Sequence, residues 1–406
     1  MKIEIDTVKG FQDFLPPESL KRNKVKEVIE KFYKLYGFLP IETPVIEFDE
    51  LMRPETLTEN EEDEAVSDRF KLKDRAGRNL GLRYEFTFQL SRIFKQNPNI
   101  KLPFRRYQIG PVFRDEPVSQ NRFRQFVQCD ADIIGDSSID SDIELISLVS
   151  DILKELKISS EIIVNNRKLL NSIVESVQIQ NISAILKELD KKDKINEDDL
   201  KANLRKYADP NQIITLFKLL EKPLSFFEEN AFDGASELQD LISKCKNLGL
   251  KINFSPFMVR GLAYYTGNIF EIKEPGKNSI AAGGRYDKLV GKYLEREIPA
   301  VGISFGLERM SELAQVKFDN TKTIVISIDE YPTAEKLVKS LRKSGVSCIL
   351  SKDKPGKALE YANSYSIPYA IFIGEKEIEI KKFNLRNMQS GEEKLLTEKQ
   401  LIKMLS

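Results

Sequence analysis

The sequence predicts an α+β domain that is interrupted by helices and followed by a small α/β domain. Three observations support this prediction. Residues 109–135 contain two runs of β-forming residues around a turn, residues from about 167 to 248 have a charge-rich helical pattern, and residues beyond 320 alternate between β and α segments. We therefore expect a first domain over residues 1–319, with the helical segment as an insertion, and a second domain over residues 320–406.

The first elements follow from spacing and from helix and strand breakers. Apolar residues keep helical spacing from Val25 to Tyr36, and Gly37 is the expected end of this helix. Pro40 and Pro44 lie in the β-type segment that follows. Proline removes a ladder hydrogen bond, so this segment is expected at the edge of a sheet.

The next segments predict a hairpin and a second helix. Residues 69–87 alternate around a turn at residues 74–77, which is typical of a hairpin, and a helix is expected from there to Lys95. Further along, Ser141 and Glu144 have the spacing of a capping box. The helix they would begin has an apolar stripe at Leu145, Val149, Ile152 and Leu156.

Composition excludes several kinds of chemistry. The 406 residues include 63 basic and 63 acidic side chains, and no histidine or tryptophan. Near-neutral charge argues against a protein that coats DNA, although a local basic patch could still bind RNA. The lack of histidine excludes Ser-His-Asp triads and histidine-ligated metals. Any reaction must therefore use carboxylates, amides, phenols, arginines and a bound ion such as Mg²⁺.

The cysteines and the amino terminus indicate a cytoplasmic address. Cys129, Cys245 and Cys348 are odd in number and widely spaced, which argues against a disulfide framework or a zinc site. The first residues lack the apolar core of a leader, and no window approaches the ~18 apolar residues of a membrane span. We expect no contact with a membrane.

The central hairpin combines a cation, acids and an amide. Arg114 and Glu116 are two residues apart on what we expect to be the first strand, and Gln128, Asp130 and Asp132 share a face of the second. A guanidinium suits phosphate, whereas carboxylate and amide groups can orient an amine or a heteroaromatic N–H. The alternative is an exposed, salt-bridged ribbon.

Three further segments carry candidate site residues. The first is L-R-Y-E-F-T, which ends at Thr87, where Glu85 could instead pair with neighbours on a solvated face. The second is R-G-L-A-Y-Y-T-G at residues 260–267. The third is A-A-G-G-R-Y-D-K-L-V-G at residues 281–291, whose Gly283 and Gly284 are expected to let a ligand lie against the strand. A tyrosine pair alone is more typical of a core.

Together these segments resemble the signature motifs of class II aminoacyl-tRNA synthetases, in the form found in histidyl-tRNA synthetases. The hairpin resembles motif 2, and the strand and helix at residues 298–310 resemble motif 3. The helix and proline-containing strand near residue 40 resemble motif 1. The resemblance implies an antiparallel class II sheet, a homodimer, and an anticodon-binding domain at residues 320–406. It also implies activation of L-histidine with ATP and transfer to tRNA(His).

The resemblance further implies roles for individual residues. Arg260 and Arg114 would act on the α-phosphate as catalytic residues. The ATP-binding set would be Arg114, Glu116, Arg122 and Arg309, with Mg²⁺ at the β- and γ-phosphates and no assigned metal ligand. The histidine-binding set would be Glu85, Thr87, Gln128, Asp132, Tyr264, Tyr265 and Tyr286.

Several positions depart from the family pattern. Ala263 replaces the aspartate of R-G-L-D-Y-Y, Ala282 replaces a glycine, and Val127 replaces an aromatic residue or histidine. Asn121 stands where glycine is usual, and asparagine tolerates positive φ better than most residues.

Two alternative functions remain at this point. One is a catalytically silent, synthetase-like regulatory subunit of ATP phosphoribosyltransferase, which would lack the carboxy-terminal domain. The other is an RNA-binding stress sensor, which would require a fused output domain.

Overall fold

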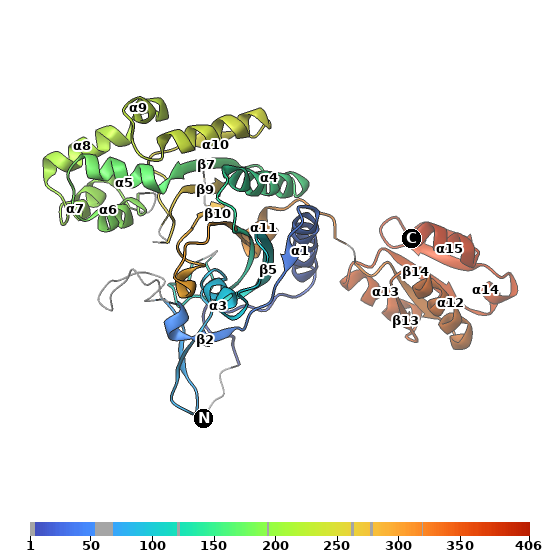
Figure 1. Cartoon of the computed structure of the whole chain (residues 1–406). Coiled ribbons are helices and arrows are strands. Elements are labelled where there is room, and N and C mark those ends of the chain that lie inside the picture. Colours follow the sequence, from blue (N-terminus) through green and yellow to red (C-terminus); the bar gives the residue numbers. More distant parts are fainter. Residues whose placement is uncertain are drawn as a thin grey trace. The chain divides into compact units, whose positions relative to one another are not determined.

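The computed structural model describes residues 5–52, 68–119, 122–192, 195–260, 264–276, 279–318 and 320–406. Asn121, Gly261 and Ala263, all considered above, lie outside these ranges. The chain forms two compact units, Met1–Val316 and Lys317–Ser406, each of which has its own sheet (Figure 1). Among the helices described, none has the length and apolar character needed to cross a membrane.

An eight-stranded sheet dominates the first unit. The strand order is β1-β5-β6-β11-β10-β9-β7-β8. Neighbours from β5 to β7 are antiparallel, and only the two edge pairs, β1–β5 and β7–β8, are parallel. The strands are β1 (Leu39–Pro40), β5 (Phe104–Phe113), β6 (Gln125–Ile134), β7 (Glu161–Asn166), β8 (Ile252–Phe254), β9 (Asn268–Lys273), β10 (Ser279–Arg285) and β11 (Ala300–Gly306). The predicted antiparallel sheet is confirmed, and the proline-containing β1 lies at its edge.

One face of this sheet is apolar and packs on helices. α1 (Glu18–Leu35) and α4 (Ile139–Glu155) lie side by side along it, and α11 (Leu307–Leu313) adjoins α1 (Figure 1). The core formed there contains Ile29 of α1, Val149 of α4 and Ile133 of β6, each with no exposed surface. Burying large aliphatic side chains is worth about 1.5–3 kcal/mol each, so this layer stabilises the sheet strongly from that side.

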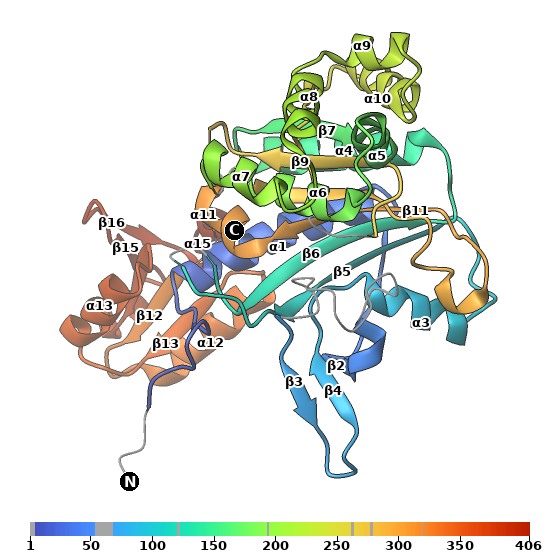
Figure 2. The same ribbon diagram turned by 90° about the vertical axis from the view of Figure 1, so that its left-hand side faces the viewer.

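The first unit also contains a smaller sheet and a helix, which lie before β5 in the sequence. The sheet has the order β2-β4-β3, with β2 (Ile46–Phe48), β3 (Lys71–Lys73) and β4 (Asn79–Leu82). The β3–β4 hairpin, predicted around residues 74–77, projects from the body of the unit (Figure 2). It leads to α3 (Phe88–Gln96), the helix expected to reach Lys95.

The charge-rich segment between β7 and β8 is helical. In both views its helices lie at the β7 end of the large sheet (Figure 1, Figure 2). The described helices are α5 (Arg167–Ser176), α6 (Ile182–Leu189), α7 (Glu197–Leu204), α8 (Pro210–Leu220), α9 (Leu224–Glu229) and α10 (Ala235–Asn247). Apolar side chains from these helices join the same core as α1 and α4, which makes the segment part of the first unit.

The second unit has a five-stranded sheet of order β13-β12-β14-β15-β16. Its elements are β12 (Thr323–Ser327), α12 (Tyr331–Lys343), β13 (Cys348–Ser351), α13 (Pro355–Ser364), β14 (Tyr369–Ile373), α14 (Glu375–Glu379), β15 (Phe383–Asn387), β16 (Glu393–Leu396) and α15 (Glu398–Leu405). The alternation of β and α segments is as predicted. The β15–β16 hairpin was not predicted, because its strands are short and only Leu385 is buried.

Two local predictions were wrong. Ser138, not Ser141, caps α4: Ser138 has the extended backbone that an N-cap needs and accepts from the Asp140 N–H at 3.1 Å. Ser141 already lies inside the helix. Arg114 and Glu116 are also not on β5, which ends at Phe113. They lie in the irregular segment that follows.

Candidate active site

The face of the large sheet opposite α1 and α4 is polar. Residues directly opposite each other on neighbouring strands share a face. One such row runs Arg106, Asp132, Gly302 and Gly284, across β5, β6, β11 and β10. The next row runs Gln108, Asp130, Ser304, Ala282 and Glu271, and reaches β9. Small residues therefore occupy β10 and β11 where acids and amides occupy β6, which lets the longer polar side chains of β6 lie across the neighbouring strand.

The glycines of β10 and β11 have different roles. On β11, a Cβ atom on Gly302 would lie 2.0 Å from Oδ1 of Asp132, so only glycine leaves room for this carboxylate. Gly284 lies in the same row as Gly302. Gly283 faces the apolar side instead, where a Cβ would lie 2.6 Å from the ring of Phe270. The expectation that Gly283 borders a ligand was therefore wrong, and its role is close packing.

Asp132 contacts groups that lie on either side of β6. Nη2 of Arg106 lies 2.7 Å from Asp132 Oδ2, and the hydroxyl of Tyr286, just beyond β10, donates to Oδ1. Both Arg106 and Asp132 are buried. Burial raises the pKa of Asp132, and the guanidinium and the tyrosine hydroxyl oppose that rise.

The other polar residues of β6 lie beside Asp132. Gln128 Nε2 donates to Ser304 Oγ at 2.7 Å and to Asp130 Oδ1 at 3.3 Å. Gln128 Oε1 is buried and has no hydrogen-bond partner among the described residues. Burial raises the pKa of Asp130 to about 7, with the nearby Asp132 carboxylate adding to the rise and Arg106 opposing it.

Three tyrosines and Glu85 complete this cluster. The Tyr264 ring lies 5.0 Å from that of Tyr265 and 5.7 Å from that of Tyr286, and it meets Phe88 edge-on. Glu85 accepts backbone N–H groups from Thr87 and Phe88, at 2.8 and 2.5 Å, and so caps α3.

The alternative that Glu85 lies on a solvated face was wrong, since it is 4% exposed. Burial raises its pKa. Thr87 is also buried and occupies the residue before α3.

Two arginines converge on Glu116. Arg122 Nε lies 2.8 Å from Glu116 Oε2, and Arg114 Nη1 lies 3.8 Å from Oε1. The Arg114 guanidinium also lies over the Tyr84 ring, 4.3 Å from its centroid. Stacking on an aromatic ring and a carboxylate on one side give this planar cation a defined orientation.

The other two arginines pair with acids at the end of β9. Arg260 Nη1 lies 3.2 Å from Glu271 Oε1, in the row that contains Asp130. Arg309, on α11, lies 3.0 Å from Glu274 and 2.9 Å from Glu312. The structure thus gathers the sequence-predicted residues into three groups: the cluster around Asp132, the Glu116 pair, and the β9 pair. No cluster of three or more metal-ligating side chains occurs in the part of the chain that the structure describes.

Sequence reasoning missed Arg106 and Ser304. Arg106 and Gln108 alternate within β5 just as Asp130 and Asp132 do within β6. Two polar residues at alternate positions of β5, Arg106 and Gln108, were the available signal. This signal was hidden by the neighbouring Arg105, which faces the other side and pairs with Glu144.

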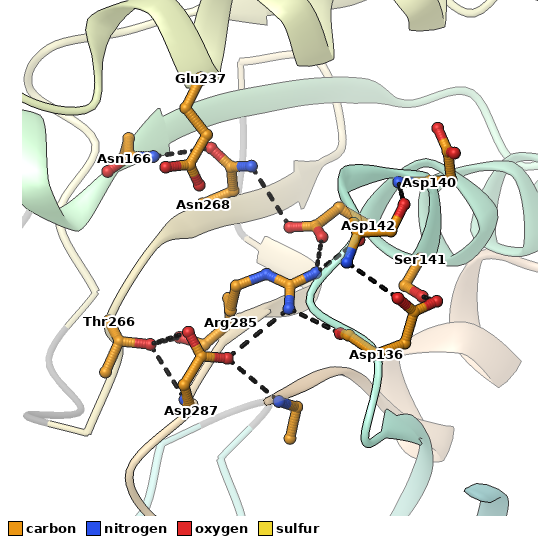
Figure 3. A network of polar contacts seen from close by, with 12 residues as sticks. Asp136, Asp140, Ser141, Asp142, Asn166, Glu237, Thr266, Asn268, Arg285 and Asp287 are labelled. Atoms are coloured by element: carbon orange, nitrogen blue, oxygen red, sulfur yellow. Dashed lines mark hydrogen bonds and ion pairs between the residues drawn. The ribbon is translucent and has the colours of Figure 1, made fainter. Parts of the chain in front are cut away.

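A second buried network of polar contacts is centred on Arg285, the residue before Tyr286. Figure 3 shows Arg285, the last residue of β10, between Asp142 of α4 and the segment before it. Its guanidinium donates to the carbonyls of Asp136 and Ser138, both at 2.9 Å, and pairs with Asp142. Burial raises the pKa of Asp142 to about 6.

This network continues into the helical insertion. Asn268 of β9 donates to Asp142 at 3.3 Å and accepts from Asn166 at 2.9 Å (Figure 3). Asn166 in turn caps the first turn of α5 by accepting from the Lys168 N–H. A chain of hydrogen bonds therefore runs from the residue beside Tyr286 to the start of the insertion.

The antiparallel sheet, its polar face and the arginines around it define a class II aminoacyl-tRNA synthetase. Comparison with known proteins narrows this class. The family model for histidyl-tRNA synthetase matches residues 10–310, and that for an anticodon binding domain matches residues 317–406. The chain belongs to the histidyl-tRNA synthetase family.

Individual relatives agree with this assignment. A protein of Bacillus cereus (strain ATCC 10987) named histidine–tRNA ligase 1 is 37% identical over 96% of this chain and 95% of its own length. The crystal structure of histidyl-tRNA synthetase from Nostoc sp. PCC 7120 matches with a TM-score of 0.85 at 28% identity, covering 100% of this chain and 99% of that one. A Bacillus halodurans structure described as an ATP phosphoribosyltransferase regulatory subunit/histidyl-tRNA synthetase has a TM-score of 0.75 at 20% identity, over 92% and 99% of the two chains, and shows the fold alone.

The Arg285 network predicts a large loss of stability on substitution. Arg285→Met leaves Asp142 buried without its cation, which costs about 3–5 kcal/mol for pairs of this kind. Chemical denaturation of the first unit measures the change. Arg78→Met serves as the control, because the Arg78–Asp74 pair is exposed and should be worth about 1 kcal/mol or less. Equal effects of the two substitutions would contradict the prediction.

The raised pKa of Asp130 leads us to expect an unusual dependence of stability on pH. Its folded pKa of about 7 lies above its ordinary value of 3.8, so the folded state binds the proton more tightly. Stability from this group is therefore present at low pH and is lost as pH rises through about 7. Asp130→Asn removes the ionisation, so its gain in free energy of unfolding over wild type should be larger at pH 8 than at pH 5 by about 2.7 kcal/mol, two pH units at about 1.4 kcal/mol each.

Thermal melting of wild type and variant between pH 5 and 8 checks this expectation. Asp198→Asn, at an exposed position of α7, is the matched control and should leave the pH profile unchanged. If Asp130→Asn shows the same pH profile as wild type, Asp130 is not the buried acid described here.

Proposed function

We propose that this chain activates L-histidine with ATP to form histidyl-adenylate and then transfers the histidyl group to tRNA(His). The observation that carries the proposal is the cluster around Asp132, a set of buried acids, an amide and phenols on one face of the large sheet. Such groups suit a substrate that has both an ammonium and an imidazole. The arginine pairs beside the cluster suit a triphosphate.

In the first step, the carboxylate of histidine attacks the α-phosphate of ATP and pyrophosphate leaves. In the second, a hydroxyl of the tRNA terminus takes the acyl group and AMP leaves. Arg114 and Arg260 are proposed to contact the α-phosphate. Positioning and charge stabilisation supply most of the catalysis of phosphoryl-type transfer, so a chain without histidine can perform it.

The histidine pocket is proposed to comprise Glu85, Thr87, Gln128, Asp132, Tyr264, Tyr265 and Tyr286. Two features support it. Gln128 Oε1 is a buried acceptor with no partner among the described residues, and Asp132 is oriented by groups on either side. A site that hydrogen-bonds its substrate rejects analogues that lack those groups by about 10⁴ or more.

For ATP, Arg122 and Arg309 are proposed at the β- and γ-phosphates and Glu116 near the adenine. Mg²⁺ is proposed to accompany the phosphates. The carboxylates near Arg260 and Arg309 are Glu271 and Glu274, and Mg²⁺ commonly uses one or two carboxylates together with phosphate oxygens. These two acids would hold the ion, which would neutralise charge on the leaving pyrophosphate.

Residues 317–406 are proposed to bind the anticodon region of tRNA(His). We also propose a homodimer. In its support, Phe48 and Leu72 flank Leu80 in one cross-strand row of the small sheet and are 49% and 40% exposed. Such exposed apolar rows suit a protein interface. The cytoplasm is the proposed location, consistent with three buried, free cysteines.

The regulatory-subunit alternative is less well supported. A silent regulator would not need cations arranged for a triphosphate, yet Arg114, Arg260 and Arg309 are all present and each is oriented by acids. Pyrophosphate exchange across the standard amino acids tests the choice. We expect exchange with histidine alone, followed by charging of tRNA(His). Binding of histidine without exchange would favour the regulator.

Arg260 is predicted to act mainly on the chemical step. Negative charge builds on the α-phosphate as pyrophosphate leaves, so the guanidinium interacts more strongly with the transition state than with bound ATP. Arg260→Ala should lower the single-turnover rate of adenylate formation by about 10² to 10³, and Arg260→Lys should recover part of it.

Thermal melting of the same variants distinguishes a structural role. If Arg260 serves only as the partner of Glu271, Arg260→Ala would melt earlier and form adenylate at the wild-type rate. That combination would refute the catalytic role. Arg105→Ala is the matched control, since it removes an arginine–glutamate ion pair on the opposite face of the sheet, outside the proposed site.

A further inference from the structure

Arg106 is a fully buried cation on the polar face of the sheet. It is among the largest side chains without exposed surface, and it lies opposite Asp132 in the β5–β6 register. Taking a guanidinium out of water is costly and requires anionic partners. A neutral side chain of similar length would fill the space at lower cost. The cation must therefore be explained by the groups around it.

Those groups are buried acids. Asp130, Asp132 and Glu85 are each 3–4% exposed, and burial raises the pKa of all three. In each case the charge of Arg106 opposes the rise. Its closest contact is with Asp132, at 2.7 Å. Arg106 thus favours the ionised form of Asp132 most directly.

The contact also fixes the direction of a short side chain. Asp132 Oδ2 faces Arg106 from β5, and Oδ1 accepts from Tyr286, which follows β10. β6 runs between these elements, so the carboxylate is held from both sides. Gly302, opposite Asp132 on β11, leaves room for the carboxylate to lie between these two groups. The plane of the carboxylate, and hence the lone pairs it offers, depends on Arg106 and Tyr286.

We propose that Arg106 is the positioning residue of the histidine pocket: from β5 it holds Oδ2 of Asp132, so that the carboxylate is aimed to accept a hydrogen bond from the substrate. Without Arg106, Asp132 would lose the cation that lies 2.7 Å from Oδ2, and its carboxylate would be free to turn about the contact with Tyr286. The inference rests on the proposed histidine site. It adds a residue that lies outside the proposed ATP-binding set, so its loss should affect one substrate only.

The test is the Michaelis constant for each substrate in pyrophosphate exchange. Arg106→Met should raise KM for histidine by about 10- to 150-fold, the range for loss of a charged hydrogen-bond partner, and leave KM for ATP within a few-fold of wild type. Arg106→Lys keeps the charge and should recover part of the loss. Arg105→Met is the matched control, because Arg105 is its neighbour on β5 but pairs with Glu144 on the opposite face.

Several outcomes would overturn the proposal. They are an equal rise in both KM values, the same histidine-specific rise in Arg105→Met, or a folded Arg106→Lys that is no better than Arg106→Met. Should Arg106→Met fail to fold, Arg106→Lys decides alone: KM for histidine must rise by a larger factor than KM for ATP, and equal factors reject the proposal.

Calorimetric titration with histidine distinguishes failure of the proposed activity from failure of the proposed role of Arg106. A wild type that binds histidine but exchanges nothing refutes the activity, whereas unchanged binding in Arg106→Met refutes the role of Arg106.

Discussion

The ion pair between Arg106 and Asp132 is the interaction on which the polar face of the large sheet depends. β6 alternates in side-chain direction, so Ile133 and Ala131 face the core while Asp132 and Asp130 face the opposite side. The apolar side is stabilised by burial against α1 and α4. On the opposite side, α3 covers an apolar cluster that includes Ile134, and the acids beside that cluster must be stabilised by charge. One buried guanidinium beside two aspartates, with glycine and alanine across from them, makes that face possible.

The same requirement explains why the helical insertion is joined to the sheet by polar groups. Arg285 ends β10, and the next residue supplies the hydroxyl that holds Asp132. Arg285 is anchored by Asp142 on α4, and Asn268 and Asn166 extend that anchor to α5. A shift of the insertion would therefore move the end of β10 through hydrogen bonds of fixed geometry, and with it the tyrosine beside Asp132.

Much of this arrangement can be predicted from the sequence because side chains alternate strictly along a β-strand. The shared face of Gln128, Asp130 and Asp132, the β3–β4 hairpin and the edge position of β1 all follow from spacing and breakers. Features that depend on the identity of the partner strand cannot be predicted from spacing. Arg106 looked like one of two adjacent arginines until β5 was paired with β6, and Gly283 could not be distinguished from Gly284 until their opposite neighbours were known. Ser141 and Glu144 matched a capping box, yet the backbone placed the cap three residues earlier.

The absence of histidine from the chain leaves recognition of the substrate to carboxylates, an amide and phenols. Buried carboxylates tend to be neutral, and burial raises the pKa of Asp130 to about 7. A carboxylate recognises an imidazole N–H as an acceptor only while it is ionised. The chain therefore needs a cation that does not lose its proton when buried, and arginine is the side chain that meets this condition. A lysine at position 106 would retain a point charge but would lose the planar guanidinium that lies 2.7 Å from Asp132, which is why the two substitutions at this position separate charge from geometry.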